Sequence, residues 1–182
     1  IVHKRSTELI SLNQKRKKIE SVILDNIDFN QIENNMDPVI IYYDPNINEG
    51  LLGIIASRLK DYFNKPSIVI TKSSNLLKGS ARSISSYNIG KTIKNLLDKN
   101  IVLNGGGHNM AAGFTLKFEN LLDFKKFITN DYVKKNISYD CDYKYDAKIA
   151  TSAFNNKFYK DIRKLEPFGN SNPSPTFLID SL

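Results

Sequence analysis

The chain has 182 residues, of which 41% are hydrophobic and 10% aromatic, which is enough to bury a core and too aromatic for a disordered segment. Its single cysteine, Cys141, excludes an internal disulfide framework and a multi-cysteine zinc site, and no apolar run approaches the roughly 18 residues that a membrane-spanning helix needs. This cysteine content is typical of a reducing compartment, so we expect a cytoplasmic protein with no membrane partner.

The formal net charge of +7 is concentrated in the middle of the sequence. Residues 36–136 contain fourteen basic and eight acidic side chains, whereas the segments on either side are nearly balanced. Between Tyr62 and Phe118 the only acid is Asp98, against eight Lys and Arg. Such a stretch is typical of an anion-binding surface, although a solvated face of a lysine-rich protein has the same composition. Arginine is rare, with five residues, so each arginine is more informative than a lysine.

Hydrophobic periodicity predicts an α/β domain with a mixed, partly parallel sheet flanked by helices. Residues 4–27 form a helix with a narrow apolar stripe, which suits a connector between domains. The strand–helix–strand order that follows predicts a crossover with parallel strands. The expected elements of the central domain are a strand at 39–43, a helix at 49–63, strands at 67–71 and 79–84, a helix at 88–97, a strand at 111–118 and a helix beginning at 120.

The pattern changes near residue 137. The expected elements are then a strand at 143–149, a helix at 153–165 and a strand at 176–179, which suggest the start of a second, mostly β domain. We therefore divide the chain into a connector helix at 1–35, an α/β domain at 36–136 and a truncated second domain at 137–182. Because the sequence has no initiator Met and stops beside a strand, we expect it to be a piece of a longer protein.

Three consecutive glycines, Gly105, Gly106 and Gly107, precede His108 and the small residues 111–113. Because glycine allows unusual backbone angles and close approach of a ligand, we predict a loop whose N–H groups bind an anion. His108 would donate a hydrogen bond or a proton to a phosphate oxygen. The alternative is a tight turn with a histidine that is satisfied internally.

A second candidate site is the segment 78–83, which reads KGSARS. In a strand, Ser80 and Arg82 lie on the same face, where the arginine fork and the serine hydroxyl can bind one phosphate. Gly79 removes a side chain at a place where a ligand could pass. The alternative is an exposed polar edge of the sheet.

A third candidate is the helix that begins near Asn48 and contains Gly50, Gly53 and Arg58. A helix that starts directly after a strand and a turn presents free N–H groups suited to an anion. Glycines at this spacing also serve the packing of a helix on a sheet, and Arg58 lies well inside the helix, where it suits a structural role.

Several kinds of catalytic centre are absent from the sequence. It contains no cluster of Asp and His with metal-ligand spacing, no Walker loop and no nucleophile elbow. Cys141 has no obvious base partner, so we expect it to be inert. A hydrolytic metal centre is therefore not expected from these residues alone.

The three candidate segments, in this order, resemble the DHH-associated domain of the RecJ exonuclease family, which belongs to the DHH phosphoesterase superfamily. The C-terminal residues resemble the entry to the RecJ OB-fold domain, and the N-terminal helix resembles the family's interdomain helix. The resemblance rests on residues 49–59 (EGLLGIIASRL), 79–83 (GSARS), 105–113 (GGGHNMAAG), 165–169 (LEPFG) and 172–173 (NP).

The resemblance implies a single-stranded-DNA-specific 5′-to-3′ exonuclease that acts in DNA repair and recombination. Manganese or magnesium would be bound by a DHH domain preceding residue 1, so this chain alone would hold no cofactor and would cut nothing. The substrate would be single-stranded DNA, which the lysine-rich surface and the OB-like residues would guide. A single-stranded-DNA-binding protein and a helicase would be partners of a monomeric parent protein.

The same resemblance implies roles for individual residues. His108 would be catalytic and would reach toward the reacting phosphate, stabilising its charge or positioning it. Ser80 and Arg82 would hold a terminal or scissile phosphate. RecJ relatives commonly carry Trp-His where this sequence has Ile47 and Asn48, which places any histidine role there in question. The other residues assigned to phosphate binding are Asn48, Lys78, Ser83, Gly105, Gly106 and Gly107.

Two other functions remain open. A DHH-type phosphodiesterase of short oligonucleotides or cyclic dinucleotides would share the phosphate-binding motifs, although such small enzymes generally lack an OB-like tail. A non-catalytic scaffold in replication or repair would bind nucleic acid without the metal ligands.

Overall fold

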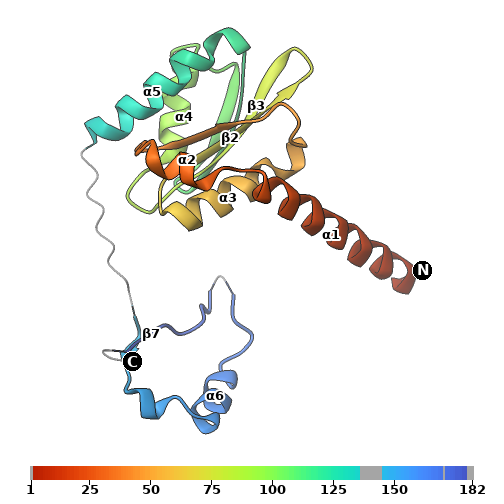
Figure 1. The fold of residues 1–182 in the computed structure, drawn as a ribbon, viewed down its shortest axis with the longest axis vertical. Coiled ribbons are helices and arrows are strands. Elements are labelled where there is room, and N and C mark those ends of the chain that lie inside the picture. The colour runs from red at the N-terminus through yellow and green to blue at the C-terminus, as the bar shows by residue number, and fades with distance from the viewer. Residues whose placement is uncertain (1, 136–144, 170, 180–182) are drawn as a thin grey trace. The chain divides into compact units, whose positions relative to one another are not determined.

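The protein is described by a computed structural model that covers residues 2–135, 145–169 and 171–179 (Figure 1). Cys141 and the beginning of the strand predicted at 143–149 lie outside the described residues. The chain forms two compact units, residues 1–137 and 138–182.

The first unit contains a five-stranded mixed sheet in the order β1-β2-β3-β5-β4. β1 is parallel to β2, as the strand–helix–strand order predicted, and the other pairs are antiparallel. The predicted α/β fold with a mixed sheet is therefore confirmed. The strands are β1 (Ile40–Tyr43), β2 (Ser67–Ser73), β3 (Leu76–Arg82), β4 (Asn104–His108) and β5 (Ala111–Leu116).

Helices cover both faces of β2 and part of the second face of β3, but only one face of β5 and β4. On one side of the sheet α4 and α5 pack on Ile68, Leu77 and Phe114 in the main core, and on the other side α3 packs on Val69 (Figure 1). Residues of β3 and β5 accordingly alternate between buried and accessible positions. The three helices are α3 (Leu52–Phe63), α4 (Ile89–Asp98) and α5 (Leu121–Lys134).

Two helices precede the sheet, α1 (Val2–Asp25) and α2 (Phe29–Asn34). α1 projects away from the sheet, and its C-terminal part packs on the domain through Ile23 and Leu24 (Figure 1). The short α2 was not predicted, and the Asp28 carboxylate caps it by accepting a hydrogen bond from the backbone N–H of Gln31. Among the described helices, none is both long and apolar enough to cross a membrane.

The segment predicted to be a glycine-rich loop is a strand, β4, at the edge of the sheet. Glycine is a poor strand former, so the sequence pattern did not predict this strand. It forms because each of its residues, from Asn104 to His108, pairs with β5. Among the described residues no glycine has a positive φ, so the left-handed backbone that an anion-binding nest requires does not form here.

The second unit contains one helix and two short strands in its described part. β6 (Ala147–Lys148) pairs in parallel with β7 (Phe177–Leu178). The helix predicted at 153–165 is shorter, α6 (Asn156–Arg163), because the Asn155 side chain caps it by accepting two backbone N–H groups. The ring of Phe158 packs edge-on against Phe177 at 5.2 Å between centroids, which ties the helix to the strand pair.

Candidate phosphate-binding site

The face of β3, β5 and β4 opposite α4 and α5, which α3 covers only in part at β3, carries the candidate site. Residues directly opposite one another in antiparallel strands project to the same side of the sheet, so the register aligns their side chains in rows. Three rows cross the open face, and together they contain most of the predicted site residues. The rows, in the order β3, β5, β4, are Lys78–Thr115–Asn104, Ser80–Gly113–Gly106 and Arg82–Ala111–His108.

Ser80 and Arg82 form the couple that the sequence predicted. An Arg82 Nη1–H donates to Ser80 Oγ at 3.3 Å and to the carbonyl oxygen of Ala81 at 2.9 Å. A Cβ at Gly53 of α3 would lie 2.8 Å from Arg82 Nη2 and 3.2 Å from Ser80 Oγ, so this glycine makes room for both side chains. Arg82 forms no ion pair with any carboxylate among the described residues, so its charge is available to an anion.

His108 lies in the same row as Arg82, with Ala111 between them. Two strand spacings separate their Cα atoms, which is about 10 Å. The imidazole is exposed and has no hydrogen-bond partner among the residues that the structure describes. A ligand lying across the row can therefore contact both the guanidinium of Arg82 and the imidazole of His108.

The turn after His108 is held by the start of α4. The backbone N–H of Ile89 donates to the carbonyl oxygen of Asn109 at 3.1 Å, and Asn88 Nδ2 donates to Asn109 Oδ1 at 2.7 Å. Gly90 allows α4 to approach closely, because a Cβ there would lie 2.6 Å from the carbonyl oxygen of His108. These three positioning residues, Asn88, Gly90 and Asn109, were not predicted, since their partners are distant in sequence.

The glycines of β4 do not play equivalent roles. Gly105 and Gly107 are needed for packing: a Cβ would lie 2.7 Å from Ile93 at Gly105 and 2.2 Å from the carbonyl oxygen of Ala111 at Gly107. At Gly106 a Cβ would meet nothing within 4 Å. Gly106 and its neighbour Gly113 therefore leave a bare stretch of backbone on the open face beside Ser80. Of the three glycines assigned to phosphate binding, Gly106 is the one whose missing side chain would project from the open face.

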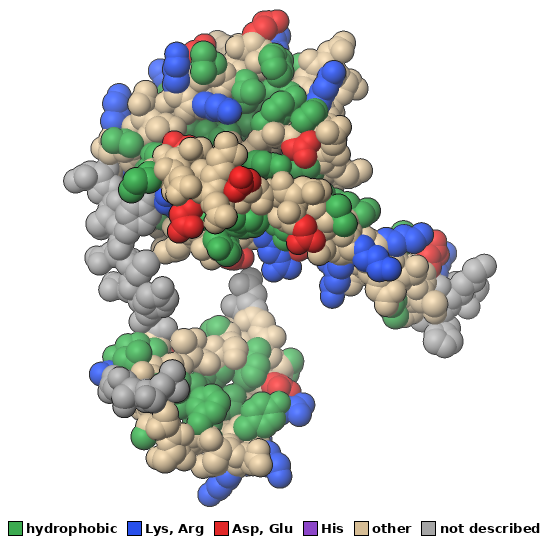
Figure 2. All heavy atoms as spheres, in the orientation of Figure 1, with side chains coloured by type: hydrophobic (Ala, Val, Ile, Leu, Met, Phe, Trp, Pro, Cys, Tyr) green, Lys and Arg blue, Asp and Glu red, His purple; other side chains and the backbone are tan. Residues whose placement is uncertain are grey.

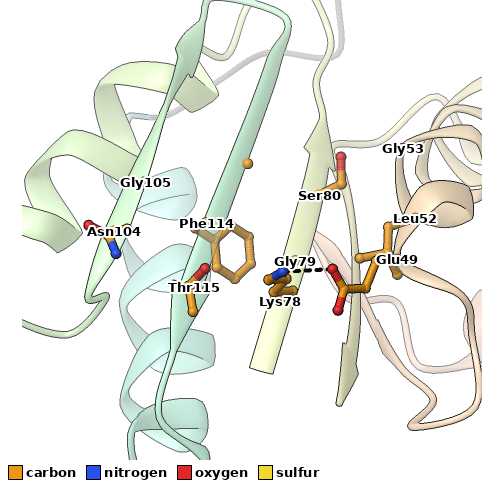
Figure 3. Close-up of a pocket in the computed structure, with 11 residues that line it drawn as sticks. Glu49, Leu52, Gly53, Lys78, Gly79, Ser80, Asn104, Gly105, Phe114 and Thr115 are labelled. Atoms are coloured by element: carbon orange, nitrogen blue, oxygen red, sulfur yellow. Dashed lines mark hydrogen bonds and ion pairs between the residues drawn. The ribbon is translucent and has the colours of Figure 1, made fainter. Parts of the chain in front are cut away.

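A cleft of about 370 Å³ lies between the start of α3 and the open strands (Figure 3). Lys78 lines it, but its ammonium group is paired with Glu49 at 2.7 Å. Hydrogen bonds from Lys78 and Ser73 hold the pKa of Glu49 below its ordinary value, so this carboxylate stays charged. Lys78 thus faces the predicted site, but its charge is already balanced by an acid 29 residues away in the sequence.

Two predicted phosphate-binding residues use their side chains elsewhere. The Ser83 side chain is turned into the protein, where Ser83 is 1% exposed and its hydroxyl donates to the carbonyl oxygen of Tyr87 at 2.6 Å. Asn48 Oδ1 accepts the backbone N–H of Gly50 at 2.9 Å and caps the 3₁₀ turn η1 (Glu49–Leu51) that precedes α3. The Ser83 side chain therefore points away from Ser80, Arg82 and His108, and the Asn48 side-chain oxygen is occupied by the cap.

Two family models match the chain. Residues 36–134 match the model of the DHHA1 domain. The chain belongs to the DHHA1 domain family. Residues 145–182 match the model of the RecJ OB domain, so the resemblance to RecJ that the sequence motifs indicated is confirmed.

Curated relatives of the chain are named single-stranded-DNA-specific exonuclease RecJ. The relative from Bacillus subtilis is 30% identical over 97% of this chain and 23% of its own length. The relative from Haemophilus influenzae is 29% identical over 93% of this chain and 31% of its own length. The chain thus spans between about a quarter and a third of the length of these curated relatives.

Solved RecJ structures share the fold. The structure of RecJ in complex with Mn²⁺ from Thermus thermophilus has a TM-score of 0.70 and 23% identity, and covers 95% of this chain and 25% of that one. A second, exonuclease RecJ bound to manganese, has a TM-score of 0.60 and 26% identity over 70% of this chain and 31% of that one. In this chain the described residues contain no cluster of three or more His, Cys, Asp and Glu side chains that could hold such an ion.

Proposed function

We propose that this chain is the DNA-binding part of a RecJ-like 5′-to-3′ exonuclease specific for single-stranded DNA, acting in DNA repair and recombination. In this proposal the catalytic ions, manganese or magnesium, are bound by residues outside this chain, and the chain alone cuts nothing. A single-stranded-DNA-binding protein and a helicase are its partners, and the parent protein is a monomer.

The observation that carries the proposal is the convergence of Ser80, Arg82 and His108 on one open face of the sheet. Arg82 is a half-buried guanidinium with no carboxylate partner among the described residues, and such a group binds phosphate with a planar pair of donors. The Ser80 hydroxyl, whose oxygen accepts a hydrogen bond from Arg82, adds its own O–H as a further donor to the same phosphate. His108 lies across the row, where it contacts the phosphate that follows along the strand or the reacting one.

The bare backbone between these side chains explains why a nucleotide chain fits. Gly106 and Gly113 face each other across β4 and β5, and neither carries a side chain that would hold a strand away from the sheet. In the stretch from 62 to 118 the one acid, Asp98, lies on α4 at the opposite face of the sheet, so no acid of this stretch opposes a polyanion at the three rows.

Removal of the Arg82 side chain tests the proposal. Arg82→Ala should weaken binding of a 5′-phosphorylated oligothymidylate to the chain between about 10- and 100-fold, as expected for losing a hydrogen-bonded charge. In the full-length protein it should lower kcat/KM by a similar factor. Lys94→Ala is the matched control, because Lys94 is exposed on α4 against the opposite face of the sheet. Unchanged binding and unchanged kcat/KM in Arg82→Ala would remove this residue from the site.

A series of oligonucleotide lengths separates this function from a phosphodiesterase of short oligonucleotides. An exonuclease that tracks a strand should bind more tightly as the oligonucleotide lengthens across the sheet. An enzyme specific for dinucleotides should gain nothing beyond two nucleotides.

A further inference from the structure

Arg58 of α3 links the candidate site to α1 through two adjoining hollows. One hollow, of about 470 Å³, lies along α3 and has Arg82 and Arg58 among its lining residues. The other, of about 410 Å³, is lined by Arg58 together with Arg16 and Lys17 of α1. Three of the five arginines in the sequence therefore line one continuous surface that begins at the sheet.

The guanidinium of Arg58 is oriented by a hydrogen bond from its Nε–H to the buried carboxylate of Glu20. Arg58 Nε–H donates to Glu20 Oε1 at 2.8 Å, and Arg16 Nη1–H donates to Glu20 Oε2 at 3.0 Å. The Glu20 side chain is 7% exposed, whereas that of Arg58 is 59% exposed. The two terminal nitrogens of Arg58 have no hydrogen-bond partner among the described residues. A guanidinium fixed through Nε presents the remaining edge, already oriented, to an anion.

One acid, Asp61, also lines this hollow and acts electrostatically on Arg58, although its carboxylate is paired with Lys60. The other residues between Arg82 and Arg58 are Gly50, Gly53, Ile54 and Ser57, three of which are small enough for a nucleotide backbone to lie close.

Arg82 and Arg58 lie at opposite edges of the hollow along α3. Gly53 lies against the Arg82 guanidinium, and Arg58 is five residues further along the helix. Five residues advance about 7.5 Å along a helix axis and turn about 140° around it, so a ligand that contacts both guanidinium groups must cross the helix surface between them. Lys and Arg side chains also gather over α1 (Figure 2).

We propose that Arg58, oriented by Glu20, is a second phosphate-binding site that holds another backbone phosphate of the strand bound at Arg82. The single strand then leaves the sheet along α3 toward Arg16 and Lys17. This inference rests on the proposed function, because the ligand of Arg58 is the same strand that Ser80 and Arg82 bind.

The test compares a ligand with one phosphate and a ligand with many. Thymidine 5′-monophosphate, titrated by NMR, occupies the Arg82 site alone, whereas a 5′-phosphorylated octathymidylate, followed by fluorescence anisotropy, reaches Arg58 as well. Arg58→Gln should weaken binding of the octamer between about three- and tenfold. It should also reduce the magnitude of the negative slope of log K against log salt by about 0.7, the value for one phosphate contact on a single strand. It should leave binding of the monophosphate unchanged.

Glu20→Gln and Arg58→Lys separate binding from a structural effect, since the Glu20 pair also fastens α1 to α3. Both variants retain the positive charge at position 58. Both should therefore weaken binding of the octamer less than Arg58→Gln does, and both should keep the wild-type dependence of log K on log salt. Lys94→Gln, an equal loss of charge on the opposite side of the sheet, should leave the octamer affinity within twofold of wild type.

The results distinguish failure of this inference from failure of the proposed function. If Arg82→Ala weakens both ligands while Arg58→Gln leaves the octamer and its salt slope unchanged, the second site does not exist. If Glu20→Gln and Arg58→Gln weaken binding of the octamer equally and leave the slope of log K against log salt unchanged, Arg58 has only a structural role. If Arg82→Ala changes neither ligand, the proposed function itself is wrong.

Discussion

Adjacent glycines of β4 should respond in opposite ways to the same substitution. Gly107→Ala would place a Cβ 2.2 Å from the carbonyl oxygen of Ala111 and 2.5 Å from the Cα of Ala112. Both obstacles are backbone atoms of the paired strand, which cannot turn aside as a flexible side chain can. Gly106→Ala would place a Cβ in open space on the other face of the same strand.

The expected magnitudes follow from these contacts. Overpacking against fixed atoms costs about 1–3 kcal/mol, and the overlap at Gly107 is severe enough to place it at the upper end or beyond. For a protein of this size about 1 kcal/mol shifts the melting temperature by about 2–4 °C, so Gly107→Ala should melt about 5–10 °C below wild type. The Gly106→Ala variant should melt at or slightly above the wild-type temperature. The reason is that ordering the backbone of an alanine costs about 0.5–1 kcal/mol less conformational entropy than ordering that of a glycine.

Thermal unfolding followed by circular dichroism measures the melting temperatures of the two variants. Titration with an oligothymidylate measures how each substitution changes DNA binding. Gly106→Ala should weaken binding about three- to tenfold despite its unchanged stability, since its methyl group stands on the bare backbone beside Ser80. Equal melting temperatures for the two variants would refute the assignment of faces in β4, and with it the rows that align Arg82 and His108. Unchanged binding in Gly106→Ala would show that the strand does not cross this backbone.

Three further predictions concern the packing behind the site. Ser83→Ala should lower the unfolding free energy by about 1–2 kcal/mol in chemical denaturation, because it leaves the buried carbonyl of Tyr87 without its donor. Burial alone would raise the pKa of Asp131, but the three side-chain hydrogen bonds that its carboxylate accepts lower the pKa in the folded protein. The stability that Asp131 contributes is therefore complete above its unfolded pKa of about 4 and is lost as the pH falls through its folded pKa. The difference in unfolding free energy between wild type and Asp131→Asn should accordingly be greatest near neutral pH and shrink below about pH 4. Asn109→Ala should increase hydrogen exchange at residues 108–110 through loss of the bond to Asn88, while the cap that Asn88 provides for α4 keeps the rest of the domain protected.

The relation between Ser80 and Arg82 could be predicted because it depends only on local geometry. Once residues 79–84 are assigned to a strand, two residues two positions apart must share a face. The helices at 49–63, 88–97 and 120 onward were predictable for a similar reason, since each carries an apolar stripe with helical spacing. Each of these features is specified by neighbours within one or two turns of the chain.

The features that escaped prediction depend on partners far away in the sequence. β4 consists largely of glycine and has no strand pattern of its own, and its conformation is imposed by β5 and by α4. The pairing of Lys78 with Glu49, and of Arg58 with Glu20, joins residues 29 and 38 positions apart. Ser83 was assigned to the ligand because it adjoins Arg82, yet the strand ends at Arg82 and the chain turns inward.

The composition of the open face indicates what kind of ligand it accepts. An uncovered half of a sheet normally exposes apolar side chains that another helix, subunit or domain must bury. Here the three rows contain no large apolar side chain, and Leu77, Phe114 and Leu116 of the same strands face the core, while Leu76 lies at the end of β3 beyond the rows. The face is therefore stable when exposed to water and offers a partner donors, positive charge and bare backbone. A polyanion that lies flat on the sheet satisfies these groups, whereas an apolar protein surface would bury Arg82 without a counter-ion at considerable cost.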